Sequence, residues 1–125
     1  MTDGVRSLDG RPDLTSTIER VSPALAAELL AASDPPLAVD LRTPPERSEK
    51  HLAGSAGVPL NHLEERVRDW PRDRKLLVYC AGGYRSSIGA SVLQRLGFSQ
   101  VQELAGGIAA WETAELPIES PKSEV

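Results

Sequence analysis

Cys80 is the only cysteine of the 125-residue chain, and the residues that follow it favour a reactive thiol. The segment reads Cys80-Ala81-Gly82-Gly83-Tyr84-Arg85-Ser86 and lies between an apolar strand pattern and a helical pattern. The N–H groups at the start of a helix have no intrahelical partner, so they attract negative charge. With an arginine nearby, a thiolate at this position should have a lowered pKa and act as a nucleophile near neutral pH.

Two elements must position this cysteine. Residues Leu76–Tyr79 are all apolar and predict a strand that is buried on both faces. After the loop, four residues recur at helical spacing and predict one apolar helix face: Ile88, Val92, Leu93 and Leu96. Gly97 then stands where a helix C-cap glycine belongs. Gly82 and Gly83 are expected to take positive φ, which would turn several N–H groups inward as an anion-binding nest.

Three stretches of the chain resemble the rhodanese family of sulfurtransferases. The loop Cys80–Ser86 resembles the active-site pattern Cys-x-x-Gly-x-Arg-Ser of that family. Asp40-Leu41-Arg42 through His51-Leu52-Ala53-Gly54-Ser55 resembles its Asp-x-Arg … Gly-His-Ile-x-Gly-Ala segment. Leu104–Trp111 resembles its Gly-Gly-x-x-x-Trp element. The resemblance runs from about Val21 to Ile118, and the loop and C-terminal element are also similar to rhodanese domains fused to metallo-β-lactamase-fold persulfide dioxygenases.

The resemblance and the loop size together imply sulfur transfer. Four residues separate Cys80 from Arg85, and cysteine-dependent phosphatases use a longer loop, so this ring should fit a sulfur atom and crowd a tetrahedral oxyanion. We expect the Cys80 thiolate to take the outer sulfur of thiosulfate or a persulfide donor, and Arg85 to stabilise the negative sulfur and hold the donor. The predicted substrate-binding residues are Ala81, Gly82, Gly83, Tyr84, Ser86 and Arg42, with a serine hydroxyl (Ser86 or Ser87) donating to the sulfur.

Two other classes of function share the nucleophile. A small phosphatase or arsenate reductase is disfavoured by the short loop. A non-catalytic or partner-fed sulfur-relay module would carry the same residues as the enzyme. Because the chain has no second cysteine to resolve a persulfide, the expected acceptor is external: cyanide, glutathione or a thioredoxin-like protein thiol.

The amino-acid composition restricts the classes of partner and cofactor that the protein is expected to bind. The net charge of −4 argues against a nucleic acid or an anionic membrane, so an anionic donor must be captured by local positive groups. One cysteine and two histidines do not make a metal cluster, and we expect neither a metal nor another cofactor. No apolar run is long enough to span a membrane, and we expect a cytoplasmic protein.

Asp40 and Arg42 follow an apolar strand, where open α/β sheets bind ligands. Asp40 is expected to fasten the neighbouring loops and to support Arg42, whereas Arg42 is either part of a structural ion pair or a positive group of the pocket. The basic run around Arg47 is expected to be a solvated face. In the light of the resemblance, His51 is expected to be structural, and Trp111 is expected to anchor the core.

The rest of the chain predicts a single α/β domain over residues 18–119, preceded by a flexible arm or linker (1–17) and followed by a tail (120–125). The predicted fold is rhodanese-like, with a mainly parallel five-stranded sheet and helices on both faces. Predicted strands or extended pieces are Ile18–Val21, Leu37–Leu41, Val58–Leu60, Leu76–Tyr79 and Gln100–Leu104. Predicted helices besides the one after the loop are Ala24–Ala32 after Ser22-Pro23, a short one with a Thr43/Glu46 capping box, one from Asn61 to about Asp69, and Ile108 to about Ala114.

Overall fold

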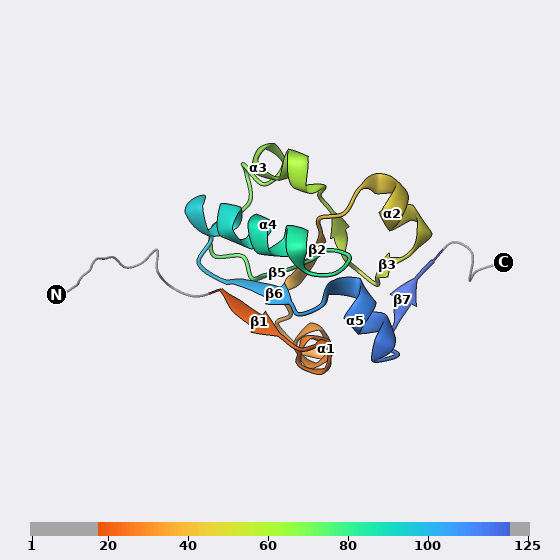
Figure 1. Ribbon diagram of the computed structural model, residues 1–125. Helices are drawn as coiled ribbons and strands as arrows, with labels where there is room; N and C mark the ends of the chain where they lie inside the picture. The colour runs from red at the N-terminus through yellow and green to blue at the C-terminus, as the bar shows by residue number, and fades with distance from the viewer. Residues whose placement is uncertain (1–17, 121–125) are drawn as a thin grey trace.

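A five-stranded parallel sheet forms the centre of the molecule (Figure 1). The computed structural model describes residues 18–120, so the predicted arm and all but the first residue of the predicted tail lie outside the described residues. The strand order is β1-β6-β5-β2-β4, and every pair is parallel. The strands are β1 (Glu19–Val21), β2 (Leu37–Asp40), β4 (Ala56–Gly57), β5 (Leu76–Tyr79) and β6 (Val101–Leu104). The predicted α/β architecture is therefore confirmed.

Helices cover both faces of this sheet, as Figure 1 shows. Helices α3 (Leu63–Arg66) and α4 (Tyr84–Arg95) lie on one face, and α1 (Pro23–Ala31) and α5 (Gly107–Thr113) lie on the other. The remaining elements are α2 (Pro44–Glu49), the 3-10 turn η2 (Leu60–His62) and a small antiparallel pair, β3 (His51–Leu52) with β7 (Ile118–Glu119). That pair was not predicted, because two-residue strands leave no periodic signal in a sequence.

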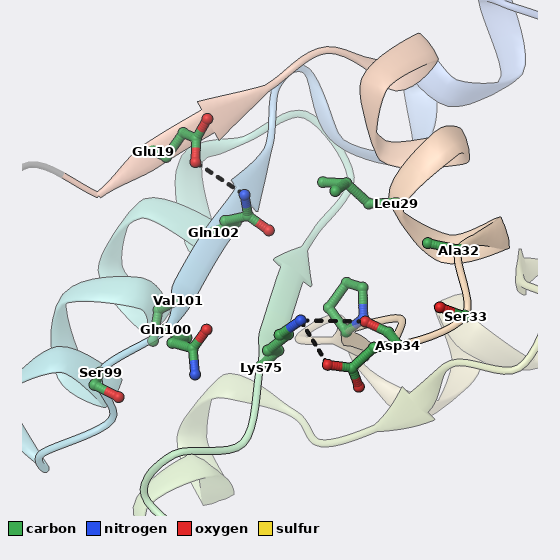
Figure 2. Close-up of a pocket in the computed structure, with 11 residues that line it drawn as sticks. Glu19, Leu29, Ala32, Ser33, Asp34, Lys75, Ser99, Gln100, Val101 and Gln102 are labelled. Carbon is green, nitrogen blue, oxygen red and sulfur yellow. Dashed lines mark hydrogen bonds and ion pairs between the residues drawn. The ribbon is translucent and has the colours of Figure 1, made fainter.

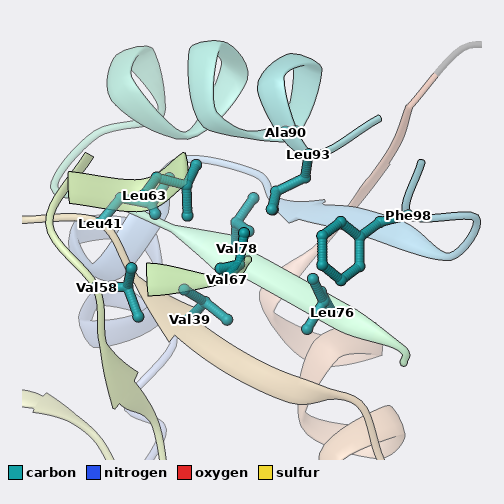
Figure 3. Packing of buried hydrophobic residues seen from close by; sticks show 10 residues of the cluster. All are labelled: Val39, Leu41, Val58, Leu63, Val67, Leu76, Val78, Ala90, Leu93 and Phe98. Atoms are coloured by element: carbon teal, nitrogen blue, oxygen red, sulfur yellow. The ribbon is translucent and has the colours of Figure 1, made fainter. Parts of the chain in front are cut away.

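The central strand β5 divides the core in two. Leu76 and Val78 face α3 and α4, in the cluster shown in Figure 3, whereas Leu77 and Tyr79 face α1 and α5. All four side chains are buried, which confirms the prediction of a strand buried on both faces. A strand held in this way gives the residue that follows it, Cys80, a fixed position at the carboxyl edge of the sheet.

Local capping explains where the helices begin and end. The Ser22 Oγ accepts from the N–H of Leu25 (3.1 Å) at the start of α1. The predicted capping box of α2 is present, since the Thr43 N–H donates to Glu46 Oε1 (2.9 Å) and the Glu46 N–H donates to Thr43 Oγ1 (3.5 Å). Helix α4 ends at Arg95 with Leu96 as its C-cap, and the glycine predicted at this end of the helix, Gly97, follows with a φ of +101°.

Three local predictions need correction in part. Leu93 is buried and Val92 and Leu96 pack against the core as predicted, but Ile88 is 42% exposed. The buried residues of α4 are Ser86, Gly89, Ala90 and Leu93. A Cβ at Gly89 would overlap Leu41 Cδ1, so the helix packs closely at this position, where only a small residue fits. The extended piece at Val58 begins earlier than predicted: residues 56–57 pair with β2 as β4, and the Val58 N–H continues this pairing by donating to the Asp40 carbonyl (2.9 Å). Asn61 does not cap a helix; it lies inside η2, and α3 ends at Arg66.

Candidate active site

The sulfur of Cys80 lies in a loop of backbone amides at the carboxyl end of β5. Cys80 is fully buried, and its Sγ accepts hydrogen bonds from the N–H groups of Gly83 (3.1 Å) and Ser86 (3.3 Å). Gly83 is the N-cap of α4 with φ +109°, a value that side chains disfavour. Gly82 does not take a positive φ, contrary to expectation, because one reversal at Gly83 is enough to turn the N–H groups toward the sulfur.

The same contacts set the ionisation of the thiol. Burial raises the pKa of Cys80, but hydrogen bonds from the hydroxyl and the N–H of Ser86 and from the N–H groups of Gly83 and Gly82 outweigh burial and hold the pKa below its ordinary value. The Ser86 hydroxyl also lies 2.7 Å from Glu103 Oε2. The donors around the sulfur therefore favour the thiolate.

Arg85 is held by a carboxylate on α2. Its Nη1 and Nη2 donate to Glu46 Oε1 (2.8 Å) and Oε2 (3.0 Å), a bidentate pair, and the side chain of Arg85 is 30% exposed. The Arg85 hydrogen bond lowers the pKa of Glu46 to about 2, so this carboxyl is ionised over the whole neutral range. Arg85 thus joins the Cys80 loop to α2, and it contributes positive charge beside the loop without donating to Cys80 in this structure.

Asp40 and Arg42 form a buried ion pair next to the site. Both Asp40 oxygens accept from Arg42, at 3.0 Å from Nε and 3.0 Å from Nη2, and the Arg42 N–H adds a bond of 2.9 Å. Arg42 is only 4% exposed. Arg47 also reaches Asp40 (3.3 Å) and Ser55 (2.9 Å), so the solvated face expected here is instead part of the structure. This is the geometry of a structural cluster, and it does not present Arg42 to a ligand.

Helix α5 packs end-on against the active-site loop. The N–H groups of Ile108 and Ala109 donate to the carbonyls of Cys80 (2.9 Å) and Ala81 (3.1 Å). Gly107 lies so close that a Cβ there would be 2.7 Å from both the carbonyl carbon and oxygen of Ala81. Gly107, the first residue of α5, therefore allows the helix to pack directly against the loop.

Trp111 and His51 hold the structure together. As predicted, Trp111 belongs to the core: it is 4% exposed, and its Nε1 donates to the carbonyl of Pro117 (2.8 Å). His51 bridges the Arg47 carbonyl (3.2 Å) and the Glu119 carboxylate (2.9 Å), a structural position like the one predicted for it.

The loop residues differ in exposure. Tyr84 is 81% exposed and Gly82 is also exposed, whereas Ala81 and Gly83 are half-buried and Ser86 is buried. A ligand would therefore first meet the residues from Ala81 to Tyr84.

Two carboxylates of the site were not identified from the sequence. Glu46 was predicted only as a helix cap, although it also binds Arg85. Glu103 was predicted only as part of a strand, although it is buried and accepts from Ser86 and Ser87. The burial of Glu103 could have been predicted from the alternation of side chains along β6. Glu103 lies on the same side of this strand as Val101, so it points into the protein.

A surface cavity of about 540 Å³ lies away from this site (Figure 2). Lys75, Ser99 and Gln102 are among its lining residues, and Lys75 immediately precedes β5, at the opposite edge of the sheet from Cys80. Its charged and amide groups are already paired: Lys75 Nζ contacts Asp34 Oδ2 (2.8 Å), and Gln102 Nε2 donates to Glu19 Oε1 (2.9 Å). We do not place the active site there.

Within residues 18–120, no three His, Cys, Asp or Glu side chains are grouped so that they could hold a metal ion. In the same residues, no helix has the length and apolar character needed to cross a bilayer.

Comparison with known proteins identifies the family that this loop defines. Residues 22–114 match the model of the rhodanese-like domain, and the chain belongs to that family. It is 33% identical over 96 residues to a sulfurtransferase of Allochromatium vinosum, covering 77% of this chain and 90% of the relative. It is 33% identical over 105 residues to the thiosulfate sulfurtransferase GlpE of Ectopseudomonas mendocina, covering 84% and 94%.

A solved structure agrees with this assignment. The rhodanese-like domain of the Anabaena protein Alr3790 superposes with a TM-score of 0.75 at 26% identity, covering 83% of this chain and 80% of that one. The fold and the family predicted from the three motifs are therefore confirmed, and the chain is homologous to sulfurtransferases.

Proposed function

We propose that the protein transfers sulfane sulfur from thiosulfate or a small persulfide to a thiol or cyanide acceptor through a persulfide on Cys80. The observation that carries this proposal is the pair of amide N–H groups, from Gly83 and Ser86, that face a buried Sγ. Fixed donors of this kind favour an anionic sulfur, whether thiolate or persulfide, and require no reorganisation during the reaction.

The proposed reaction has two half-reactions. The Cys80 thiolate attacks the outer sulfur of thiosulfate, a new S–S bond forms, and sulfite leaves with the electron pair of the broken S–S bond. Cyanide or a thiolate then attacks the terminal sulfur of the Cys80 persulfide, giving thiocyanate or a new persulfide and restoring the thiolate. No net oxidation or reduction occurs, and the kinetics should be ping-pong.

The surroundings of the loop assign roles to the other residues. Arg85 supplies positive potential for the anionic donor while Glu46 fixes its direction. Because Cys80 is fully buried, the loop from Ala81 to Tyr84 must open slightly for the outer sulfur of the donor to reach Sγ. The atom attacked in thiosulfate is a terminal sulfur, so it needs less opening of the loop than a phosphate ester, in which the atom attacked is the central phosphorus.

The acceptor and the compartment also belong to this proposal. A persulfide with no resolving cysteine in the chain must pass to an outside thiol, such as glutathione or a thioredoxin-like protein. Such acceptors are reduced in the cytoplasm, which is where we place the reaction.

Intact mass spectrometry tests the proposal, with Cys80→Ser as the matched control. After incubation with thiosulfate we expect a gain of one sulfur mass, about 32 Da, that cyanide removes and that the serine variant lacks. A gain from glutathione persulfide but not from thiosulfate would support the partner-fed or fused relay. Absence of sulfur uptake from both donors, together with hydrolysis of an aryl phosphate, would replace sulfur transfer by phosphatase activity.

A further inference from the structure

Glu46 offsets the charge of Arg85 as well as fixing its direction. Both terminal nitrogens of the guanidinium donate to this carboxylate, Nη1 to Oε1 at 2.8 Å and Nη2 to Oε2 at 3.0 Å. A bidentate pair of this length brings one positive and one negative unit charge together. Seen from a distance, the pair is therefore close to neutral.

The carboxylate of Glu46 is held in place by its own helix. Its Oε1 also accepts from the N–H (2.9 Å) and from the hydroxyl (3.0 Å) of Thr43, at the start of α2. The pKa of Glu46 is lowered to about 2, so the group is ionised at every pH at which a thiolate would react. The negative charge beside Arg85 is therefore fixed and permanent.

The charge of Arg85 acts on the sulfur, although none of the hydrogen bonds described for this arginine goes to Cys80. The hydrogen bond from Arg85 to Glu46 raises the pKa of the arginine against the effect of burial, and the charges of Glu46, Cys80 and Asp40 raise it further. Asp40 is itself bound by two other arginines, at 3.0 and 3.3 Å. An anion that approaches Cys80 thus meets an arginine that is already paired with Glu46.

The two classes of sulfur donor differ in how much they need this arginine. Thiosulfate is a dianion whose charge lies next to the sulfur that is transferred, so it is repelled by a thiolate unless a cation compensates. A persulfide of low net charge is repelled less. Pairing Arg85 with Glu46 therefore penalises thiosulfate more than a low-charge persulfide.

We propose that Glu46 is a specificity-determining residue that acts through Arg85: it offsets the charge of the arginine and so shifts the donor preference of Cys80 from thiosulfate toward persulfides of low charge. The preference for a donor rests on the proposed function. The electrostatic effect does not, because any anionic reagent that approaches Cys80 meets the same pair.

Two alkylating reagents of similar size, iodoacetate and iodoacetamide, test the electrostatic effect without a sulfur donor. The first is an anion and the second is neutral, and both react with the same thiolate, so the ratio of their rates cancels changes in the pKa of Cys80. Glu46→Gln removes the charge and keeps an oxygen that can cap α2. We expect the ratio of iodoacetate to iodoacetamide rates to rise about threefold to tenfold at low salt, as Coulomb's law gives for one charge about 10 Å from a reacting anion near a protein surface. Adding KCl to about 0.5 M should remove most of the rise.

Two variants separate charge from structure. Glu46→Asp keeps the charge and shortens the side chain, so its ratio should stay near the wild-type value. Glu49→Gln removes an equal charge from an exposed residue at the other end of α2 and should also leave the ratio near that value. An unchanged ratio in Glu46→Gln, or an equal rise in Glu46→Asp, would overturn the inference.

The wild-type protein gives a second test that needs no variant. Because the pair is close to neutral, the ratio should not fall as KCl is added to the wild type. A fall of about threefold would show that Arg85 acts as an uncompensated cation, and it would overturn the inference as well.

The donor preference is measured by mass spectrometry, as the rate of sulfur uptake from thiosulfate and from cysteamine persulfide, whose ammonium group offsets the charge of its sulfur. Glu46→Gln should raise the rate with thiosulfate about threefold or more and change the rate with cysteamine persulfide less than about twofold. Equal changes with the two donors would overturn the assigned specificity. If neither donor gives uptake while the alkylation ratio rises in Glu46→Gln, the proposed function fails and the electrostatic effect of Glu46 stands, so the two failures are distinguishable.

Discussion

Substituting Gly107 by alanine should damage both the stability and the reactivity of the protein. The residue has φ +63°, and a Cβ there would lie 2.7 Å from the carbonyl carbon and oxygen of Ala81 and still closer to the carbonyl oxygen of Cys80. These are backbone atoms of the active-site loop and cannot rotate away. The loop and the start of α5 must therefore separate.

The cost follows from what that separation breaks. A left-handed backbone costs an alanine about 1 kcal/mol, and the loss of each of the two hydrogen bonds from Ile108 and Ala109 to the loop carbonyls costs about 1 kcal/mol more. With the remaining overlap, we expect Gly107→Ala to lower the free energy of unfolding by about 3–4 kcal/mol.

Gly54→Ala is the matched control. Gly54 has a similar φ of +77°, and a Cβ there would meet no atom within 4 Å. Only the cost of a left-handed backbone applies to this variant, so the free energy of unfolding should fall by about 1 kcal/mol. Urea unfolding followed by far-UV circular dichroism measures both losses of stability. The alkylation rate of Cys80 at pH 7 shows whether the conformation of the active-site loop has changed.

The comparison of the two variants tests the packing argument. Gly107→Ala should change the alkylation rate and slow sulfur uptake, and Gly54→Ala should leave both at the wild-type value. Equal losses of stability in the two variants, or an unaltered Cys80 rate in a folded Gly107→Ala, would show that α5 does not support the loop.

Two further predictions concern the charged residues around the loop. Asp40→Asn should lower the free energy of unfolding by about 3–5 kcal/mol, because it leaves the buried guanidinium of Arg42 without its carboxylate; chemical denaturation measures this. Glu46 has a pKa depressed from 4.5 to about 2 by Arg85, so its stabilising effect is fully present above pH 4.5 and is lost as the pH falls toward 2. Glu46→Gln should flatten the stability curve in that window, as thermal melts between pH 2 and 6 will show.

Each of these two predictions has an outcome that would contradict it. Asp34→Asn removes an exposed partner of Lys75 and should cost far less than Asp40→Asn; similar costs would contradict a buried pair. If Glu46→Gln keeps the acid loss of the wild type, then Glu46 is not its source.

Much of the site could be predicted because its signals are local. Cys80, the loop glycines and the start of α4 are close together in the sequence, and their chemistry depends on backbone conformations that neighbouring residues dictate. The same holds for the strand β5, whose four apolar residues require burial on both faces, and for the capping box of α2. Features formed by residues that are close together in the sequence can therefore be predicted from the sequence alone.

Tertiary structure decided what surrounds the loop. Glu46 binds Arg85 across 39 residues of sequence, and Glu103 binds Ser86 across 17. Neither pairing has a periodic or spacing signal, because parallel strands bring distant segments to one edge only after the sheet has formed.

The error at Ile88 has a related cause. The spacing of apolar residues predicts a helix, but it does not determine which side of α4 faces the sheet. That side depends on how closely the helix approaches its neighbours, and at Gly89 the approach to Leu41 leaves no room for a larger side chain. The sequence by itself determined the loop that follows Cys80 and the layered fold, since these follow from local backbone chemistry and burial. Packing between distant elements determined which carboxylates hold the arginine and the serines that surround the sulfur.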